Sequence, residues 1–178
     1  MSLLTYSSLM RFVESGIIDN IEPEQVNAAS IDIRLGESLL VEDLSNKHTH
    51  IHLSRGGAPR LVPGDWILHP GQFALANTME VFNLPNDVAC EYKLKSSLAR
   101  AGLDHSLAGW ADPGFHNATL TLELHNSLQH HSLVLEPGMR IGQMVFFRGD
   151  VVPMDHSYRV KGRYNHQRRA TESKGVST

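Results

Sequence analysis

The sequence has little cysteine, little net charge and no long hydrophobic segment. Its single cysteine, Cys90, excludes an internal disulfide and a cysteine-rich zinc site. The 16 basic and 19 acidic residues leave a net charge of -3, which does not indicate nucleic acid or an anionic membrane as a partner. No apolar run approaches the roughly 18 residues of a membrane span, and no N-terminal signal pattern is present. We therefore expect a soluble, cytoplasmic protein.

The hydrophobic residues recur periodically along the chain, first with a helical spacing and then with the period of two that is typical of strands. Near the N-terminus the spacing predicts a short helix, which Ser7 or Ser8 would cap and Gly16 would end. Its apolar face would consist of Leu9, Phe12, Val13 and Ile17. From residue 30 onward the period is two, as in "ASIDIRLG".

Short strands separated by turn dipeptides fill the rest of the chain. The expected strands include residues 66–69, 73–82, 119–124 and 142–147. Pro-Gly or Pro-Asn turns begin at Pro63, Pro70, Pro85, Pro113 and Pro137. This pattern is typical of an antiparallel sandwich or barrel. With 178 residues and 41% hydrophobic residues, we expect one domain over residues 1–178, with 156–178 forming a mobile C-terminal lid and tail.

Eleven histidines raise the question of a metal site. His48, His50 and His52 alternate and would share one face of a strand, as three zinc ligands could. An exposed edge strand seldom supplies the supporting hydrogen bonds that a metal site needs, so a solvated face is the preferred interpretation. One cysteine also cannot complete the H-x-E and P-C-x-x-C signature of zinc deaminases.

The segment "KSSLARAGL", residues 95–103, gathers cations and hydroxyl groups within one turn. Lys95, Ser96, Ser97 and Arg100 could bind a polyphosphate together with free backbone N–H groups. An ordinary serine-capped turn with solvated charges would have the same sequence. Both interpretations remain open at this point.

The segment "AGWADPGFHNATLTLELHN", residues 108–126, contains two carboxylates. Asp112 lies in a Pro-Gly turn and could be a fixed hydrogen-bond acceptor, whereas Glu123 interrupts an alternating apolar strand and shares its face with Thr121 and His125. If that face is solvent, Glu123 needs no explanation. If it lines a cleft, desolvation would raise its pKa and suit it to proton transfer near neutral pH.

The chain resembles the dCTP deaminase family of the trimeric dUTPase-like superfamily over nearly its whole length. The matching blocks are "ASIDIRLG", "LHPGQFALANTMEVFNLP", "KSSLARAGL", "AGWADPGF" with "TLELHN", and "GRYNHQ". The resemblance implies a mainly β fold, a distorted, jelly-roll-like antiparallel β-barrel of dUTPase type with a short N-terminal helix. It also implies a homotrimer with active sites at subunit interfaces, deamination without zinc, and Mg²⁺ accompanying the triphosphate.

The same resemblance implies a role for each matching residue. Glu123 would be the general acid/base, and Ser96 and the backbone of Ala108 would position the attacking water. The phosphate-binding turn would consist of Lys95, Ser96, Ser97, Leu98, Ala99 and Arg100. Asp112 would hold the deoxyribose 3′-hydroxyl, and the main chain of Thr121 and Leu122 would contact the base. The lid residues would be Tyr158, Arg163 and Gln167.

Three functions fit this pattern. The first is deamination of dCTP to dUTP and ammonia, with feedback inhibition by dTTP through the loop that holds His105 and Ser106. The second is a bifunctional dCTP deaminase and dUTP diphosphatase that yields dUMP, or a dUTPase. The third is a non-catalytic nucleotide sensor, for which a desolvated Glu123 would serve little purpose.

Overall fold

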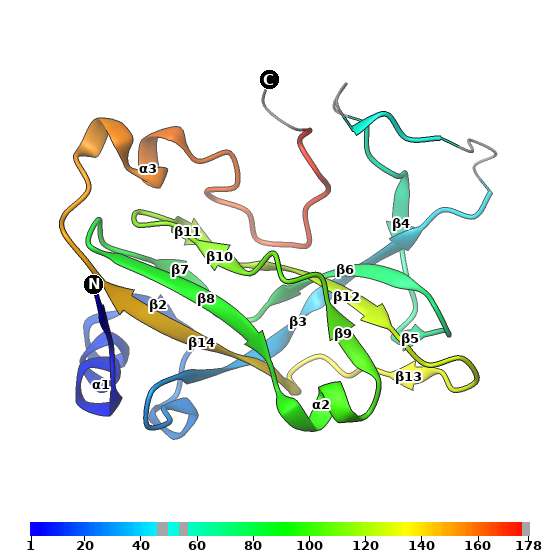
Figure 1. Cartoon of the computed structure of the whole chain (residues 1–178), viewed down its shortest axis with the longest axis horizontal. Helices are drawn as coiled ribbons and strands as arrows, with labels where there is room; N and C mark the ends of the chain where they lie inside the picture. Colours follow the sequence, from blue (N-terminus) through cyan, green and yellow to red (C-terminus); the bar gives the residue numbers. More distant parts are fainter. Residues whose placement is uncertain (46–49, 54–56, 176–178) are drawn as a thin grey trace.

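The computed structural model describes residues 1–45, 50–53 and 57–175, and strands make up most of its regular structure (Figure 1). The helices are α1 (Tyr6–Ser15), α2 (Ser96–Arg100) and α3 (Tyr158–Lys161), with 3-10 turns at Pro23–Gln25 and Met154–His156. The strands are β1 (Ser2–Leu3), β2 (Ile18–Asp19), β3 (Ile31–Glu42), β4 (Leu61–Pro63), β5 (Ile67–Leu68), β6 (Phe73–Thr78), β7 (Val81–Asn83), β8 (Val88–Leu94), β9 (Leu103–His105), β10 (Trp110–Ala111), β11 (His116–Ala118), β12 (Thr121–Asn126), β13 (Leu133–Val134) and β14 (Arg140–Arg148).

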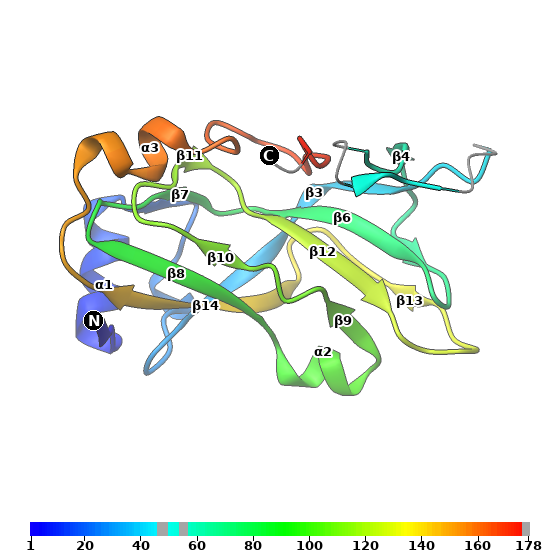
Figure 2. The same cartoon turned by 45° about the horizontal axis from the view of Figure 1, so that its top comes forward.

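The main sheet has the strand order β10-β8-β14-β3-β6-β12-β9, and neighbouring strands run antiparallel. It curls along its length, so that β10 and β12, from opposite ends of the order, lie on the same side of the molecule (Figures 1 and 2). The mainly β, barrel-like fold expected from the sequence is confirmed as a curled half-barrel.

The N-terminal helix forms as predicted, although its cap differs. Leu9 and Phe12 are buried against the core, and Gly16 ends the helix in the left-handed conformation at φ 69°. Thr5 is the residue before the first helical turn, and its side chain makes no capping hydrogen bond. The predicted serine cap is therefore wrong; Ser8 lies inside the helix and accepts a hydrogen bond from Arg11.

Two buried carboxylates alter the simple alternation of the strands. The predicted strand 73–82 is broken into β6 and β7 because the intervening Glu80 turns into the interior, where Arg34 Nε donates to it at 2.9 Å. In β3, Ile31 and Ile33 are buried as expected, but Asp32 between them is also buried. Both faces of β3 are thus covered, one by the apolar core and one by polar contacts.

The C-terminal segment, defined here as residues 158–175, runs back across the sheet near β11 and β12 (Figure 1). The backbone N–H of Thr119 donates to the carbonyl of Gln167 at 3.0 Å, which ties the segment to the start of β12. Its expected mobility as a lid remains a prediction. Within the described ranges, no helix has both the length and the apolar character that a membrane span requires.

Candidate active site

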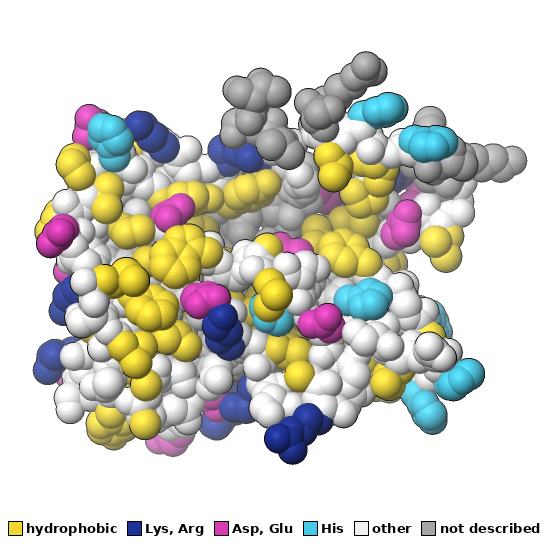
Figure 3. Space-filling model, in the orientation of Figure 1, with side chains coloured by type: hydrophobic (Ala, Val, Ile, Leu, Met, Phe, Trp, Pro, Cys, Tyr) yellow, Lys and Arg dark blue, Asp and Glu magenta, His cyan; other side chains and the backbone are white. Residues whose placement is uncertain are grey.

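A cavity of about 550 Å³ lies between the sheet and the C-terminal segment. Strands β6, β10 and β12 form its floor, and the C-terminal segment covers it with Tyr158, Tyr164, Gln167 and Thr171. Figure 3 shows the surface hollowed at this place, with hydrophobic side chains around the hollow. The cavity therefore has an apolar wall, as a site that excludes water requires.

Glu123 projects into this cavity from the middle of β12. It is paired across the ladder with Leu75 of β6, which also lines the cavity, and apolar Phe73 follows on the same wall. Burial raises the pKa of the Glu123 carboxyl above its ordinary value, against a smaller lowering effect from a backbone hydrogen bond. A carboxyl with a raised pKa can take up and return a proton near neutral pH. Of the two interpretations left open above, the geometry favours the cleft.

The loop after β9 is held close to Glu123. Ser106 donates its backbone N–H to the Glu123 carbonyl at 3.1 Å, and Leu107, at φ 55°, donates its own to His105 Nδ1 at 3.2 Å. Because that nitrogen accepts, His105 is neutral in this arrangement, and burial lowers its pKa accordingly. Ala108 follows and lines the cavity. The sequence-predicted pair of Glu123 and Ala108 is thus brought together.

Gln167 joins the C-terminal segment to β12 and the residues just before it. Its Nε2 donates to the carbonyl of Thr119 at 2.8 Å and to Thr121 Oγ1 at 3.2 Å. Its Oε1 is buried and has no hydrogen-bond partner among the described residues. This amide therefore offers an acceptor to a ligand that carries an N–H group. Leu122, by contrast, turns its side chain into the core.

Asp112 directly follows Trp110 and Ala111, which line the cavity. Trp110, which lines the cavity, donates its indole N–H to Asp112 Oδ1 at 2.9 Å. Tyr158 lies nearby: burial raises the pKa of its hydroxyl, and the charge of Asp112 adds to the effect. The structure thus places the predicted residues Thr121, Tyr158 and Gln167 around one space with Glu123, and it places Asp112 in contact with Trp110 of the cavity wall.

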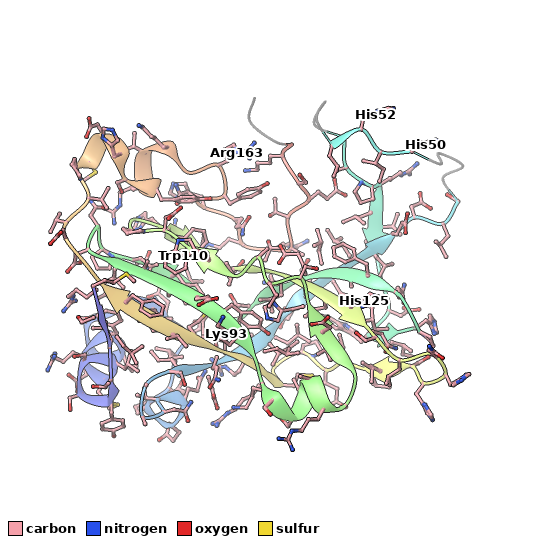
Figure 4. The ribbon with its side chains drawn as sticks, viewed as in Figure 1. His50, His52, Lys93, Trp110, His125 and Arg163 are labelled. Atoms are coloured by element: carbon pink, nitrogen blue, oxygen red, sulfur yellow. The ribbon has the colours of Figure 1, made fainter. Side chains whose placement is uncertain are left out.

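The predicted phosphate-binding turn lies elsewhere. Lys95 precedes α2, and the exposed residues Ser96, Ser97 and Arg100 lie on it, at the lower edge of the molecule in Figure 1. None of residues 95–100 lines the cavity. Within a single chain, the predicted phosphate-binding turn is therefore separate from the cavity that holds Glu123. Arg163 also points away, because its guanidinium donates to the carbonyl of Gly175 at 2.7 Å (Figure 4).

Some lining residues were missed by the sequence analysis. Tyr164 and Thr171 come from the polar tail, where neither has a periodic pattern around it. Leu61 and Phe73 belong to strands whose pairing brings them beside Glu123, and that pairing is not readable from local sequence. The bond between Trp110 and Asp112 has a local signal, since side chains two residues apart on a strand point to the same side.

The structure describes two members of the histidine triplet, His50 and His52, which Figure 4 shows at the edge of the molecule, on the segment that leads to β4, and neither lines the cavity. His48 lies outside the described residues. Within the described part of the chain, no three His, Cys, Asp or Glu side chains are grouped so that they could hold a metal ion.

The comparisons with known proteins define the class of protein. The family model described as dCTP deaminase-like matches residues 3–149. The chain therefore belongs to the dCTP deaminase-like family.

Two relatives make the likeness more specific. The chain is 42% identical over 184 residues to a Thermobifida fusca protein named "dCTP deaminase, dUMP-forming", covering 97% of this chain and 92% of the relative. It is 43% identical over 167 residues to an Acidothermus cellulolyticus protein of the same name, with coverage of 88% and 85%.

Among solved structures, the chain is similar to a 2′-deoxycytidine 5′-triphosphate deaminase from Agrobacterium tumefaciens. The TM-score is 0.59 and the identity 20%, and the match covers 83% of this chain. It spans about half of the solved chain, 48%. This likeness supports the fold.

Proposed function

We propose that this chain is a bifunctional enzyme that converts dCTP to dUMP. The observation that carries the proposal is a desolvated Glu123 in a covered cavity, in a chain 42% identical to a dUMP-forming dCTP deaminase over nearly its whole length. In the first step water adds to C4 of cytosine and ammonia leaves, which gives dUTP. In the second step water attacks the α-phosphorus, which gives dUMP and pyrophosphate.

Glu123 carries the protons of the first step. Its carboxylate takes a proton from the attacking water and passes it to N3 of the ring, and the same group then takes the proton of the new C4 hydroxyl and delivers it to the leaving amine, so that ammonia departs and a C4 carbonyl remains. The backbone at Ala108 and the hydroxyl of Ser96 position that water, and the main chain of Thr121 and Leu122 contacts the base. Gln167 Oε1, buried without a protein partner among the described residues, is available to accept from the exocyclic amine of cytosine.

The remaining predicted residues bind the sugar and the phosphates. Asp112 accepts from the deoxyribose 3′-hydroxyl and, alone or with a neighbour, orients the water of the second step. Residues 95–100 bind the triphosphate, while Tyr158 and Arg163 belong to the lid of residues 156–178 that closes over it. The separation of the turn from the cavity within one chain supports a homotrimer whose sites each use two subunits.

Mg²⁺ fits this arrangement as a companion of the substrate. The described residues form no metal-binding group of their own, and Mg²⁺ usually takes most of its ligands from substrate phosphates and water. When bound, it would neutralise phosphate charge and orient the chain of phosphates. We further propose a cytoplasmic enzyme subject to inhibition by dTTP at the same site.

The products distinguish the candidate functions. The protein is incubated with Mg²⁺ and either dCTP or dUTP, and ammonia, pyrophosphate and dUMP are measured. Equimolar ammonia, pyrophosphate and dUMP support the bifunctional enzyme. Ammonia with dUTP and no pyrophosphate would reduce the proposal to a deaminase, and no product from dCTP or dUTP would indicate a sensor. Glu123→Gln, as control, should bind dCTP and release no ammonia.

Subunit mixing tests the shared site. Chains carrying Glu123→Gln and chains carrying Ser96→Ala are unfolded, mixed and refolded together. If each site takes its carboxylate and its serine from different chains, mixed trimers contain some intact sites and regain activity. If both residues act within one chain, every site stays defective and the mixture remains inactive.

A further inference from the structure

Trp110 and Asp112 form a contact that the reaction described above does not yet use. Both side chains leave β10 and the following turn on the same side, and the indole Nε1 donates to Asp112 Oδ1 at 2.9 Å. Figure 4 shows Trp110 at the edge of the sheet that faces the C-terminal segment. A bond from a neutral donor to an ionised carboxylate is stronger than one between neutral groups.

The indole is held in place from two directions. The backbone of Trp110 pairs with Glu91 of β8. The indole ring stacks on the ring of Phe147, with centroids 6.1 Å apart and an angle of 26° between the ring planes. The side chain nevertheless remains 48% exposed and contributes to the cavity wall. Trp110 is therefore a rigid donor at the mouth of the site.

Asp112 has less support of its own. It is exposed, and its backbone carbonyl accepts from Phe115 N at 3.0 Å within a turn that Gly114 completes at φ 89°. Among the described residues, the indole is the hydrogen-bond partner that the structure gives its side chain, and it occupies Oδ1. The second oxygen, Oδ2, is left to accept from a ligand hydroxyl, since an ionised carboxylate is only an acceptor.

We propose that Trp110 is a positioning residue of the sugar subsite: by holding Oδ1, it aims Oδ2 of Asp112 at the 3′-hydroxyl of the deoxyribonucleotide. The inference rests on the proposed function, because it requires that Asp112 binds the sugar. Without the indole, the Asp112 carboxylate can rotate about its side-chain bonds. Binding the 3′-hydroxyl must then also order this side chain, and the entropy cost lowers the affinity for the sugar. The loss should affect only substrates that carry that hydroxyl.

The test compares kcat/KM for dCTP and for 2′,3′-dideoxy-CTP in the wild type, Trp110→Phe, Asp112→Asn and the double variant. Trp110→Phe keeps the ring stacked on Phe147 and removes the donor. We expect it to lower kcat/KM for dCTP roughly five- to tenfold, as for a lost bond to a charged group at a partly exposed site, and to change the dideoxy substrate less than about twofold. In the double variant, the tryptophan substitution should add little to Asp112→Asn.

Equal losses on both substrates would mean that Trp110 acts through packing alone, and no loss on dCTP would mean that it does not position Asp112; either result overturns the inference. A wild type that deaminates both substrates equally well would overturn the sugar role of Asp112, whereas a wild type inactive on both would overturn the proposed function itself. Thermal melting and gel filtration check that each variant folds. If Trp110→Phe does not fold, Trp110→Leu also removes the donor and the same comparison applies.

Discussion

Lys95 Nζ lies 2.8 Å from Asp32 Oδ1, and the carboxylate that it contacts is almost completely buried. Arg140 binds the other oxygen, Oδ2, at 3.1 Å, and Asn27 Nδ2 also donates to Oδ1 at 2.9 Å. The residue expected to bind phosphate is therefore also part of the support of β3. Such a charge is costly to leave unpaired, because a buried carboxylate without partners has lost its hydration.

Replacing Lys95 should therefore impair both stability and substrate binding. We expect Lys95→Met to lower the free energy of unfolding by about 2 kcal/mol, less than for a fully buried pair because Lys95 is partly exposed and Arg140 remains. Arg100→Met is the matched control: Arg100 is exposed on α2, so its loss should change stability by less than about 0.5 kcal/mol. Both variants should raise the KM for dCTP. Urea unfolding and steady-state kinetics measure the two effects, and equal stability losses would contradict the structural role of Lys95.

Tyr92 presents the opposite case, a buried polar group without a partner. Its hydroxyl has no hydrogen-bond partner among the described residues, and burial, with a contribution from the charge of Glu123, raises its pKa. We expect Tyr92→Phe to raise the free energy of unfolding by about 1 kcal/mol, because it removes a desolvated hydroxyl and keeps the ring. The exposed Tyr6→Phe should be neutral. A loss of stability in Tyr92→Phe, measured by urea unfolding, would show that the hydroxyl is satisfied in solution.

The features that the sequence predicted are those encoded locally. The helix ending at Gly16 and the alternation of Ile31 and Ile33 depend on spacing alone, and the structure confirms both. The position of Glu123 on a strand was also local. Whether its face was solvent or cleft was not, because the wall opposite comes from Leu75 and from the C-terminal segment, more than 30 residues away in either direction.

The break between β6 and β7 shows why other features could not be predicted. "FALANTMEVF" reads as one continuous strand, and local sequence does not show that Arg34 and Gln25 lie where they can bind an inward-turned Glu80. The assignment of the catalytic and substrate-binding residues, and of the mobile lid, remains a prediction for the experiments described here.

The raised pKa of Glu123 makes its ionised carboxyl a source of instability. A carboxyl whose pKa is higher in the folded than in the unfolded protein contributes stability that is present below the unfolded value and is lost as the pH rises through the folded one. Burial raises the pKa of Glu123 from an ordinary value of 4.5. Glu123→Gln should therefore be as stable as the wild type at pH 4 and more stable at pH 8, and the difference between them should grow with pH by at most about 1.4 kcal/mol per pH unit. Urea unfolding across this range measures the difference; a constant difference at both pH values would contradict the ionic origin.

Two histidines join the C-terminal segment to β11. The rings of His116 and His166 have centroids 6.1 Å apart. His116 Nδ1 accepts from Arg159 at 3.3 Å, and His166 Nδ1 lies 3.1 Å from Asn117 Nδ2. Arginine can only donate, and Asn117 Oδ1 accepts from Arg168, which leaves its amide nitrogen as the donor to His166. Both imidazoles are consequently neutral acceptors in this contact, with Arg159 and Arg168 as the cations nearby.

Protonation should release this contact. A proton on His116 Nδ1 removes an acceptor and adds a positive charge beside Arg159. Burial lowers the pKa of His116 from 6.5, with smaller contributions from Arg159 and His166. A lowered pKa means that the stabilisation is present above pH 6.5 and is lost as the pH falls through the folded value. We expect hydrogen-exchange protection of residues 163–171, corrected for intrinsic rates, to fall between pH 7.5 and 5, by at most about tenfold per pH unit through the protonation of His116.

The double variant His116→Gln/His166→Gln is the matched control for this release. Glutamine keeps a hydrogen-bonding side chain and does not titrate, so its protection should be independent of pH over the same range. The hydrogen bonds from Gln167 to Thr119 and Thr121 do not involve a titrating group and should persist in both proteins. Retained protection in the wild type at pH 5 would show that these amide contacts hold the segment without the histidines. Equal pH dependence in the double variant would place the titrating group elsewhere.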